Sequence, residues 1–311
     1  MNRLPKPSLT GASASLQPLA VRYVPRLGLV LILLLLGACS GTTFLYNRLN
    51  IIIPWYVDSY VDLDREQKRY LGDLLDPFLD WHRNEELSSY VAILDQVTDD
   101  LDAPVTAEGV RAVSREFENA WFRLESRGLE WMLDLGEQLS DEQMDEFIES
   151  LSDKQQDYEE KYLERTDEEF RRESYDGLKD SLQDYMGRLD SAQRERLERA
   201  SQELRRSDSV WLTERRAWIE RAENMLQREP GWQDEVRQAI ARRDATVSQE
   251  YVDTYTHNLE VIHAAIAEVI DSRSEKQDRR LRRELQDLRA DLQTLIAQGQ
   301  AARPCPARKD P

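Results

Sequence analysis

The fold class follows from residues 281–295, which read LRRELQDLRADLQTL. Leucine recurs in this stretch in alternating steps of four and three residues, at Leu281, Leu285, Leu288, Leu292 and Leu295. This spacing brings the leucine side chains to one face of an α-helix, as in a coiled-coil seam. The charged residues between them fall on the other faces. The stretch therefore predicts a long amphipathic helix that packs against a neighbour.

The same period recurs over much of the chain. Apolar residues follow one another in steps of three and four within residues 110–135, 175–189 and 252–269. No proline interrupts the chain between Pro104 and Pro230, and no alternating run of β-branched residues predicts a strand. We expect an all-α protein, an elongated bundle of long amphipathic helices. The last two seams are expected to pair as a C-terminal antiparallel hairpin across the polar break 271–278.

The N-terminus has the three parts of a secretion signal. Residues 1–26 hold four bases and no acid, residues 27–36 are apolar, and Gly37-Ala38-Cys39 follow. The apolar part is about half as long as the roughly 20 residues that a membrane-spanning helix needs. These features predict export from the cytoplasm.

Residues 36–39, LGAC, resemble the bacterial lipobox. The resemblance implies that Cys39 is the lipidation site, that residues 1–38 are a cleaved signal peptide, and that acyl chains on Cys39 hold the protein in a bilayer. Ser40 follows the cysteine where an aspartate would favour the inner membrane. This implies an outer-membrane lipoprotein that faces the periplasm. The alternative is an ordinary signal peptide with a chance cysteine.

Charge and boundaries complete the outline. We expect a lipidated tether over residues 39–53, a helical domain over 54–300 and a disordered tail over 301–311, in which Cys305 stands alone if Cys39 is acylated. The formal net charge of −18 disfavours nucleic acid as a partner. The expected partners are the bilayer, through Cys39, and another protein or a second copy of the chain. The apolar run 51–56 either rests on the membrane interface or packs under the helical domain.

A short motif occurs at several places: leucine, then Ser or Asp, two residues, then Gln. It predicts capping boxes, in which the Ser or Asp and the Gln satisfy free backbone N–H groups at a helix start. The occurrences begin at Leu63, Leu139, Leu151 and Leu189. The motif resembles the Leu-Thr-x-x-Gln motif of Spy-like periplasmic chaperones, which are helical and bind unfolded clients. That resemblance implies a chaperone-like role in envelope stress.

A broader resemblance covers the N-terminal third. Tyr46-Asn47-Arg48-Leu49, the run PWYVDSYVDL at 54–63 and the run WHRNEEL at 81–87 are similar to a family of proteobacterial lipoproteins of unknown function. This resemblance supports the lipoprotein class and implies no activity.

The candidate metal ligands are the three histidines of the chain. His257, Glu260 and His263 follow one another in steps of three residues, which spreads them over an arc of about 120° on a helix. A zincin helix instead places two histidines four residues apart on one face. His82 is the remaining histidine, so a metal-dependent hydrolase would need to combine all three. We predict no metal site here.

Other polar clusters are interpreted structurally. His82, Arg83, Glu85 and Glu86 form a dense group beside Trp81, which is expected to tie two helices together at a turn. The acidic residues between Asp58 and Asp80 lack the glycine and terminal glutamate of a calcium loop. The basic run 279–283 is expected to dock against acidic N-terminal helices, within the chain or between copies.

The sequence contains no phosphate-binding glycine loop, dinucleotide fingerprint or nucleophile elbow. We therefore predict no catalytic residue and no cofactor. The expected function is that of a non-enzymatic, outer-membrane-anchored protein that binds other proteins or itself. The alternatives are a chaperone for unfolded clients and the metal-dependent hydrolase.

Overall fold

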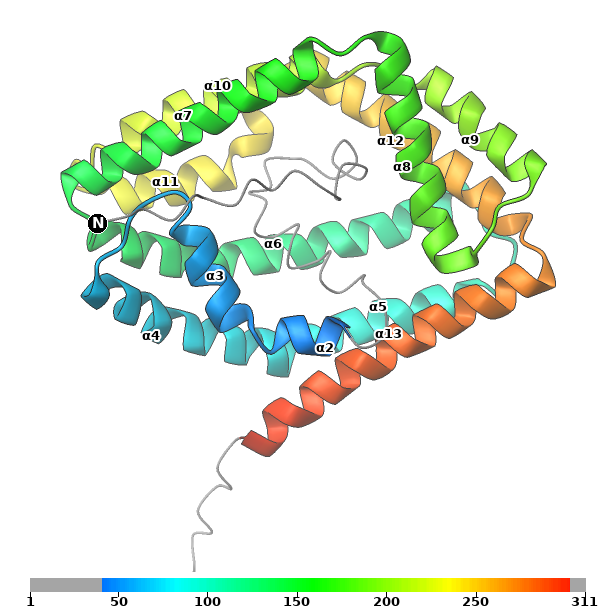
Figure 1. Ribbon diagram of the computed structural model, residues 1–311, viewed down its shortest axis with the longest axis horizontal. Helices are drawn as coiled ribbons and strands as arrows, with labels where there is room; N and C mark the ends of the chain where they lie inside the picture. The colour runs from blue at the N-terminus through cyan, green and yellow to red at the C-terminus, as the bar shows by residue number, and fades with distance from the viewer. Residues whose placement is uncertain (1–40, 303–311) are drawn as a thin grey trace, which may run out of the picture.

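The computed structural model describes residues 41–302 (Figure 1). Every regular element in that range is a helix, which confirms the expected all-α class. In chain order the elements are α2 (Gly41–Tyr46), α3 (Leu49–Val57), α4 (Arg65–Trp81), η1 (His82–Glu86), α5 (Leu87–Asp100), α6 (Ala107–Glu137), α7 (Asp141–Leu163), α8 (Asp167–Met186), α9 (Ser191–Glu203), α10 (Asp208–Met225), α11 (Trp232–Ala241), η2 (Arg243–Ala245), α12 (Gln249–Asp271) and α13 (Glu275–Ala302).

Several of these helices begin with a capping box. In each box, the side chain of the residue before the helix accepts a hydrogen bond from the backbone N–H of the residue three positions later. The side chain of that later residue accepts a hydrogen bond from the backbone N–H of the first. The pairs are Asp64–Gln67 in α4, Ser140–Gln143 in α7, Thr166–Glu169 in α8 and Asp190–Gln193 in α9. The helix starts predicted at residues 64, 140 and 190 are thereby confirmed.

The box predicted at Leu151 is wrong. Residues 151–155 lie inside α7, whose buried side chains Met144, Leu151 and Tyr158 follow one another every seven residues. Nothing in the sequence breaks this period, so the backbone N–H groups there are already used by the helix. Gln155 instead reaches across to α10, where its Nε2 donates to the carbonyl of Leu212 over 3.1 Å.

The 31-residue helix α6 crosses the middle of the molecule (Figure 1). It packs against α4 and α5 on one side and against α12 on the other. Helices α7 and α10 pack against each other, and α10 also contacts α12. Helices α8 and α9 form a second pair, in which α9 packs against α12 and α8 packs against α13. Most of the buried apolar side chains form one continuous core, which includes Leu71, Leu75, Leu124, Leu197 and Leu295.

The predicted C-terminal hairpin is wrong. The two helices are joined by residues 272–274 but diverge from that turn (Figure 1). Helix α12 packs against α6 and α9, whereas α13 packs against α5 and α8. At the turn, the side chain of Gln193 at the start of α9 binds both the carbonyl of Val269 near the end of α12 and the side chain of Gln277 at the start of α13. The leucine seam of α13 faces α5 and α8.

The segment expected as a lipidated tether is helical from residue 41 onward. Residues 41–57 form α2 and α3, and these helices bury Tyr46, Leu49 and Ile53 against the body. Of the two alternatives for the run 51–56, packing under the domain holds for Ile53, while Ile51 and Trp55 stay exposed.

Two groups of predictions fall outside the described residues. The signal peptide, Cys39, Ser40 and most of the predicted tail with Cys305 lie there, while Ala301 and Ala302 still belong to α13. Among residues 41–302, no helix combines the length and the apolar character that crossing a bilayer requires.

Candidate functional site

An irregular stretch of backbone joins α4 to α5. Residues His82–Glu86 form a π-helical turn, closed by the N–H of Leu87 bonding to the carbonyl of His82. Such turns insert one extra residue into a helix and often mark functional positions. Here the turn carries both His82 and Glu86 into the interior, where each is almost fully buried.

His82 is held between two tyrosines. The Tyr46 hydroxyl of α2 lies 2.8 Å from His82 Nδ1, and the Tyr90 hydroxyl of α5 lies 3.3 Å from Nε2. Burial, with help from the nearby Arg83, lowers the pKa of His82 to about 3. The ring is therefore neutral at physiological pH. Since a neutral imidazole has one donor and one acceptor nitrogen, one tyrosine donates to the ring and the other accepts from it.

The two tyrosines are equally confined. Burial raises the pKa of Tyr46 and of Tyr90 well above the usual value of a phenol. The ring of Tyr46 stacks on His82, with centroids 5.7 Å apart, and the ring of Tyr90 meets His82 edge-on. We call Tyr46, His82 and Tyr90 the His82 triad. It joins α2, η1 and α5 through neutral groups that hold their protons.

Arg83 adds a second connection between α2 and the body. Its Nη2 donates to Asn47 Oδ1 over 2.8 Å, and its guanidinium lies 5.0 Å from the centroid of the Tyr46 ring. Asn47 in turn donates to Gln298 of α13 over 3.2 Å. The turn after α2 is thereby bound both to the π-helical turn and to the last helix.

Glu86 faces the opposite way, toward α6. Arg123 binds it with two parallel contacts, Nε to Oε2 at 2.9 Å and Nη2 to Oε1 at 2.6 Å. This bidentate pair pins the π-helical turn to the central helix. Arg83 and Glu86 thus tie helices together at a turn, as the sequence predicts, while Glu85 is exposed. The sequence does not reveal Arg123, because it lies 37 residues from its partner and no local motif marks it.

The other two histidines lie in separate surroundings. His257 is half-buried, and its Nε2 lies 2.9 Å from the carbonyl oxygen of Glu203. His263 is buried between α12 and α6, where its Nε2 lies 3.0 Å from the Ser114 hydroxyl. Burial and the nearby Arg111 lower the pKa of His263. The fold does not gather the candidate ligands: residues 41–302 contain no group of three or more His, Cys, Asp or Glu side chains placed to hold a metal ion.

Part of the predicted electrostatic docking occurs within the chain. Arg282 of the basic run binds Asp102, just after α5, over 2.8 Å, and Arg289 farther along α13 binds Asp95 of α5 over 2.5 Å. The acceptors belong to α5 and its end rather than to the acidic residues before it. Asp58, one of those residues, binds Lys68 of α4 over 2.8 Å instead.

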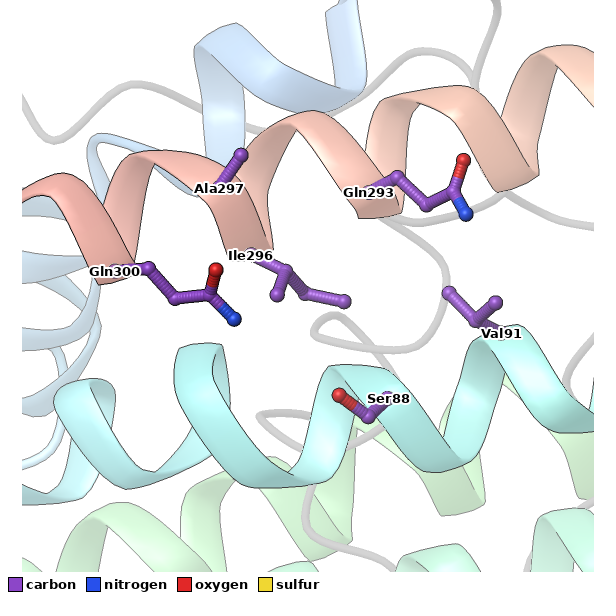
Figure 2. A pocket seen from close by; sticks show the side chains of 6 residues that line it. All are labelled: Ser88, Val91, Gln293, Ile296, Ala297 and Gln300. Carbon is purple, nitrogen blue, oxygen red and sulfur yellow. The ribbon is translucent and has the colours of Figure 1, made fainter.

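A shallow groove of about 300 Å³ lies between α5 and α13 (Figure 2). Ser88 and Val91 line it from α5, and Ile296 with the glutamines Gln293 and Gln300 lines it from α13. No charged side chain lines this groove. Its chemistry is that of a small apolar strip with amide edges and the hydroxyl of Ser88, and no acid or base among its lining residues could activate that hydroxyl.

Comparison with known proteins places the chain in a family. Residues 59–252, more than half of the chain, match the family of unknown function DUF6279. The match begins in the turn after α3 and ends in the first turn of α12, so it includes His82, Glu86 and Arg123. No curated protein and no solved structure matches the chain. The chain therefore belongs to DUF6279, a family whose function is not known.

Proposed function

We propose that this protein is a lipoprotein of the bacterial envelope, acylated at Cys39 and held at the periplasmic face of the outer membrane. Its helical body acts by binding another protein or a second copy of itself rather than by catalysis. The observation that carries the proposal is the position of α2. This helix begins at Gly41, two residues after the lipobox cysteine, and the His82 triad fastens it to the body. An anchor at Cys39 therefore holds the whole body close to the bilayer.

The titratable groups favour a non-enzymatic role. Both ring nitrogens of His82 are engaged, and a pKa of about 3 makes the imidazole too weak a base for general base catalysis near neutral pH. Ser114 and His263 form a Ser–His contact, but Ser114 lies within α6. The backbone N–H groups around it are used by the helix, so they cannot form an oxyanion hole.

Metabolic labelling with palmitate tests the anchor. The wild-type protein is expected to incorporate the label and to sediment with the outer membrane, whereas Cys39→Ala incorporates none and leaves that fraction. Cys305→Ala is the matched control, since it removes the other cysteine of the chain and is expected to behave as the wild type. Absence of label from the wild type, or its retention in Cys39→Ala, would contradict the proposal.

In-cell crosslinking tests the interaction half. We expect the full-length protein to give discrete crosslinked species that contain one envelope protein or a second copy of the chain. A small molecule that accumulates when the gene is deleted, and that the purified protein converts, would contradict the non-enzymatic role.

A further inference from the structure

The most exposed large apolar side chains among residues 41–302 belong to α2 and α3. Phe44, Ile51 and Trp55 are 56%, 59% and 55% exposed. Ile51 and Trp55 are four residues apart, so they share one face of α3. The guanidinium of Arg48, the residue before α3, lies 4.2 Å from the centroid of the Phe44 ring and links the two helices on this side. We call Phe44, Arg48, Ile51 and Trp55 the N-terminal apolar face.

The opposite side of the same helices is already occupied. Tyr46, Leu49 and Ile53 are buried against the body, and the His82 triad fixes the rotation of α2. The exposed side chains therefore cannot turn inward without breaking these contacts. A large aromatic ring and a β-branched side chain held in water cost free energy, and clustered apolar side chains of this kind mark interaction surfaces.

The charge of the segment separates it from the rest of the surface. The chain has 60 acidic residues, and none of them precedes Asp58. Helices α2 and α3 thus carry no acid, and the one charged side chain within residues 41–57 is Arg48. Exposed apolar residues elsewhere, such as Phe117 and Leu163, stand beside glutamates. Asp291 of α13, which lies beside Thr43 of α2, is an acid that a neighbouring helix brings to this segment. Because α2 and α3 carry none of their own, they meet less repulsion from anionic lipid headgroups than the acidic remainder of the surface.

We propose that the N-terminal apolar face is a membrane-contact surface that inserts Ile51 and Trp55 into the interface of the lipid bilayer. The inference rests on the proposed lipid anchor, because acylation of Cys39 places the start of α2 at the headgroups. Trp is favoured at that depth, and an amphipathic segment lying in the interface buries its apolar side there. Arg48 reaches the phosphates beside it. The surface adds a second contact to the anchor and fixes the orientation of the body on the membrane.

A fluorophore at single positions tests this contact in the full-length acylated protein. In a Cys305→Ser background, Ile51→Cys and Trp55→Cys are labelled with an environment-sensitive dye. Leu163→Cys is the matched control, since Leu163 is 46% exposed but lies at the far end of α7. Each protein is reconstituted into vesicles of phosphatidylethanolamine and phosphatidylglycerol, with and without spin-labelled lipid. We expect a blue shift and quenching by the spin label at positions 51 and 55, and neither at position 163.

Each other outcome overturns the inference. Palmitate labelling of the same preparation shows whether the anchor is present. A protein that incorporates no palmitate contradicts both the proposed function and this inference. An acylated protein whose dyes at 51 and 55 do not respond removes the membrane contact alone. Quenching at 163 as well means unspecific adsorption. A blue shift that grows with protein concentration in the absence of vesicles means that a second copy covers the surface instead.

Discussion

Gln67 at the start of α4 and Gln143 at the start of α7 exchange two hydrogen bonds through their side-chain amides, each 2.8 Å long. Each amide also caps its own helix, because its oxygen accepts from the backbone N–H of Asp64 or Ser140. The remaining N–H groups donate to the carbonyls of Gln138 and Asp62. Both amides thereby use two donors and two acceptor positions, which is their full capacity.

A second pair of the same kind lies at the other end of the molecule. Gln193 of α9 and Gln277 of α13 face each other, with Gln277 Nε2 donating to Gln193 Oε1 over 2.8 Å and both side chains buried. Gln277 caps α13 through the backbone N–H of Ser274 and donates to the carbonyl of Arg188. The glutamine of the motif therefore has two roles: it caps a helix, and it joins that helix start to another one far away in the sequence.

Replacing glutamine by glutamate separates these roles. Glu169 in the Thr166 box shows that a carboxylate suffices for capping. A carboxylate has no N–H group, however, so it cannot donate to the partner glutamine as an amide does. Gln143→Glu and Gln277→Glu are expected to lower the free energy of unfolding by about 1–3 kcal/mol each, since they leave a polar partner unsatisfied. The loss should be larger for Gln277, which is buried. Urea denaturation measures both.

The reverse substitution, Glu169→Gln, is the control. No glutamine faces it, and its side chain accepts from Thr166 within its own helix start. We expect a change below about 1 kcal/mol, of the size of one charge at a helix N-terminus. Equal losses at residues 143, 277 and 169 would mean that capping alone explains the glutamines.

The sequence predicts the caps but not the pairs, for a physical reason. A capping box is local, so Asp64 and Gln67 suffice to recognise it. The partner amide is 76 residues away in one pair and 84 in the other, and no local pattern encodes that distance. The cap of α13 is not predicted, because Arg273 stands where the three correctly predicted boxes have leucine.

In the candidate site, too, the sequence predicts the local turn but not the long-range contacts. The polar run 81–87 predicts a structural turn, and Arg83 and Glu86 confirm it. The burial of His82 does not follow from that run, because charged residues surround it in the sequence. It results from the π-helical turn together with the packing of Tyr46 and Tyr90 from two other helices. The motif resembling that of chaperones is accounted for within the fold, since Gln67, Gln143 and Gln193 all bind inside the protein.

A buried ion pair gives a second prediction. Asp208 at the start of α10 binds Arg165 through Oδ1 at 2.5 Å and Oδ2 at 2.8 Å, and Arg206 adds a contact of 2.9 Å. Asp208→Asn leaves the largely buried Arg165 with Glu173 as its remaining carboxylate partner, at 2.7 Å, and is expected to destabilise the protein by about 2–3 kcal/mol. Asp176→Asn, which removes an exposed partner of Lys179, is expected to cost about 1 kcal/mol or less. Similar losses in the two variants would contradict this reading of the pair.

The pKa of His82 predicts an acid-dependent loss of stability. The unfolded chain binds a proton at this histidine near pH 6.5, whereas the folded protein does so only near pH 3. Below pH 6.5 the unfolded state therefore holds one proton more, and stability falls by up to about 1.4 kcal/mol per pH unit until pH 3. Above pH 6.5 the residue contributes no pH dependence.

His82→Gln removes this contribution while keeping an amide that can bind the tyrosines. Between pH 7 and pH 5 the wild type is expected to lose about 2 kcal/mol more stability than the variant, measured by urea denaturation at both values. In the wild type, NMR signals of the His82 ring should keep the shifts of the neutral form over the same range. Equal pH slopes in the two proteins, or a ring that titrates near pH 6, would show that the triad is open to water.

Gly299 and Gly72 form a matched pair of glycines for the last prediction. Both lie inside helices, where alanine is normally more stable than glycine by about 0.5–1 kcal/mol. A Cβ on Gly72 would meet no atom within 4 Å, so Gly72→Ala should stabilise the protein by that amount.

A Cβ on Gly299 would lie 2.7 Å from Asn84 Oδ1 and 2.8 Å from Arg83 Cδ. Gly299→Ala should therefore push α13 away from the π-helical turn and weaken the contact of Arg83 with Asn47. We expect it to destabilise the protein in a thermal melt where Gly72→Ala raises the Tm. If both alanines stabilise equally, α13 does not approach the turn that closely, and the connection between the last helix and α2 is looser than the contacts of Asn47 indicate.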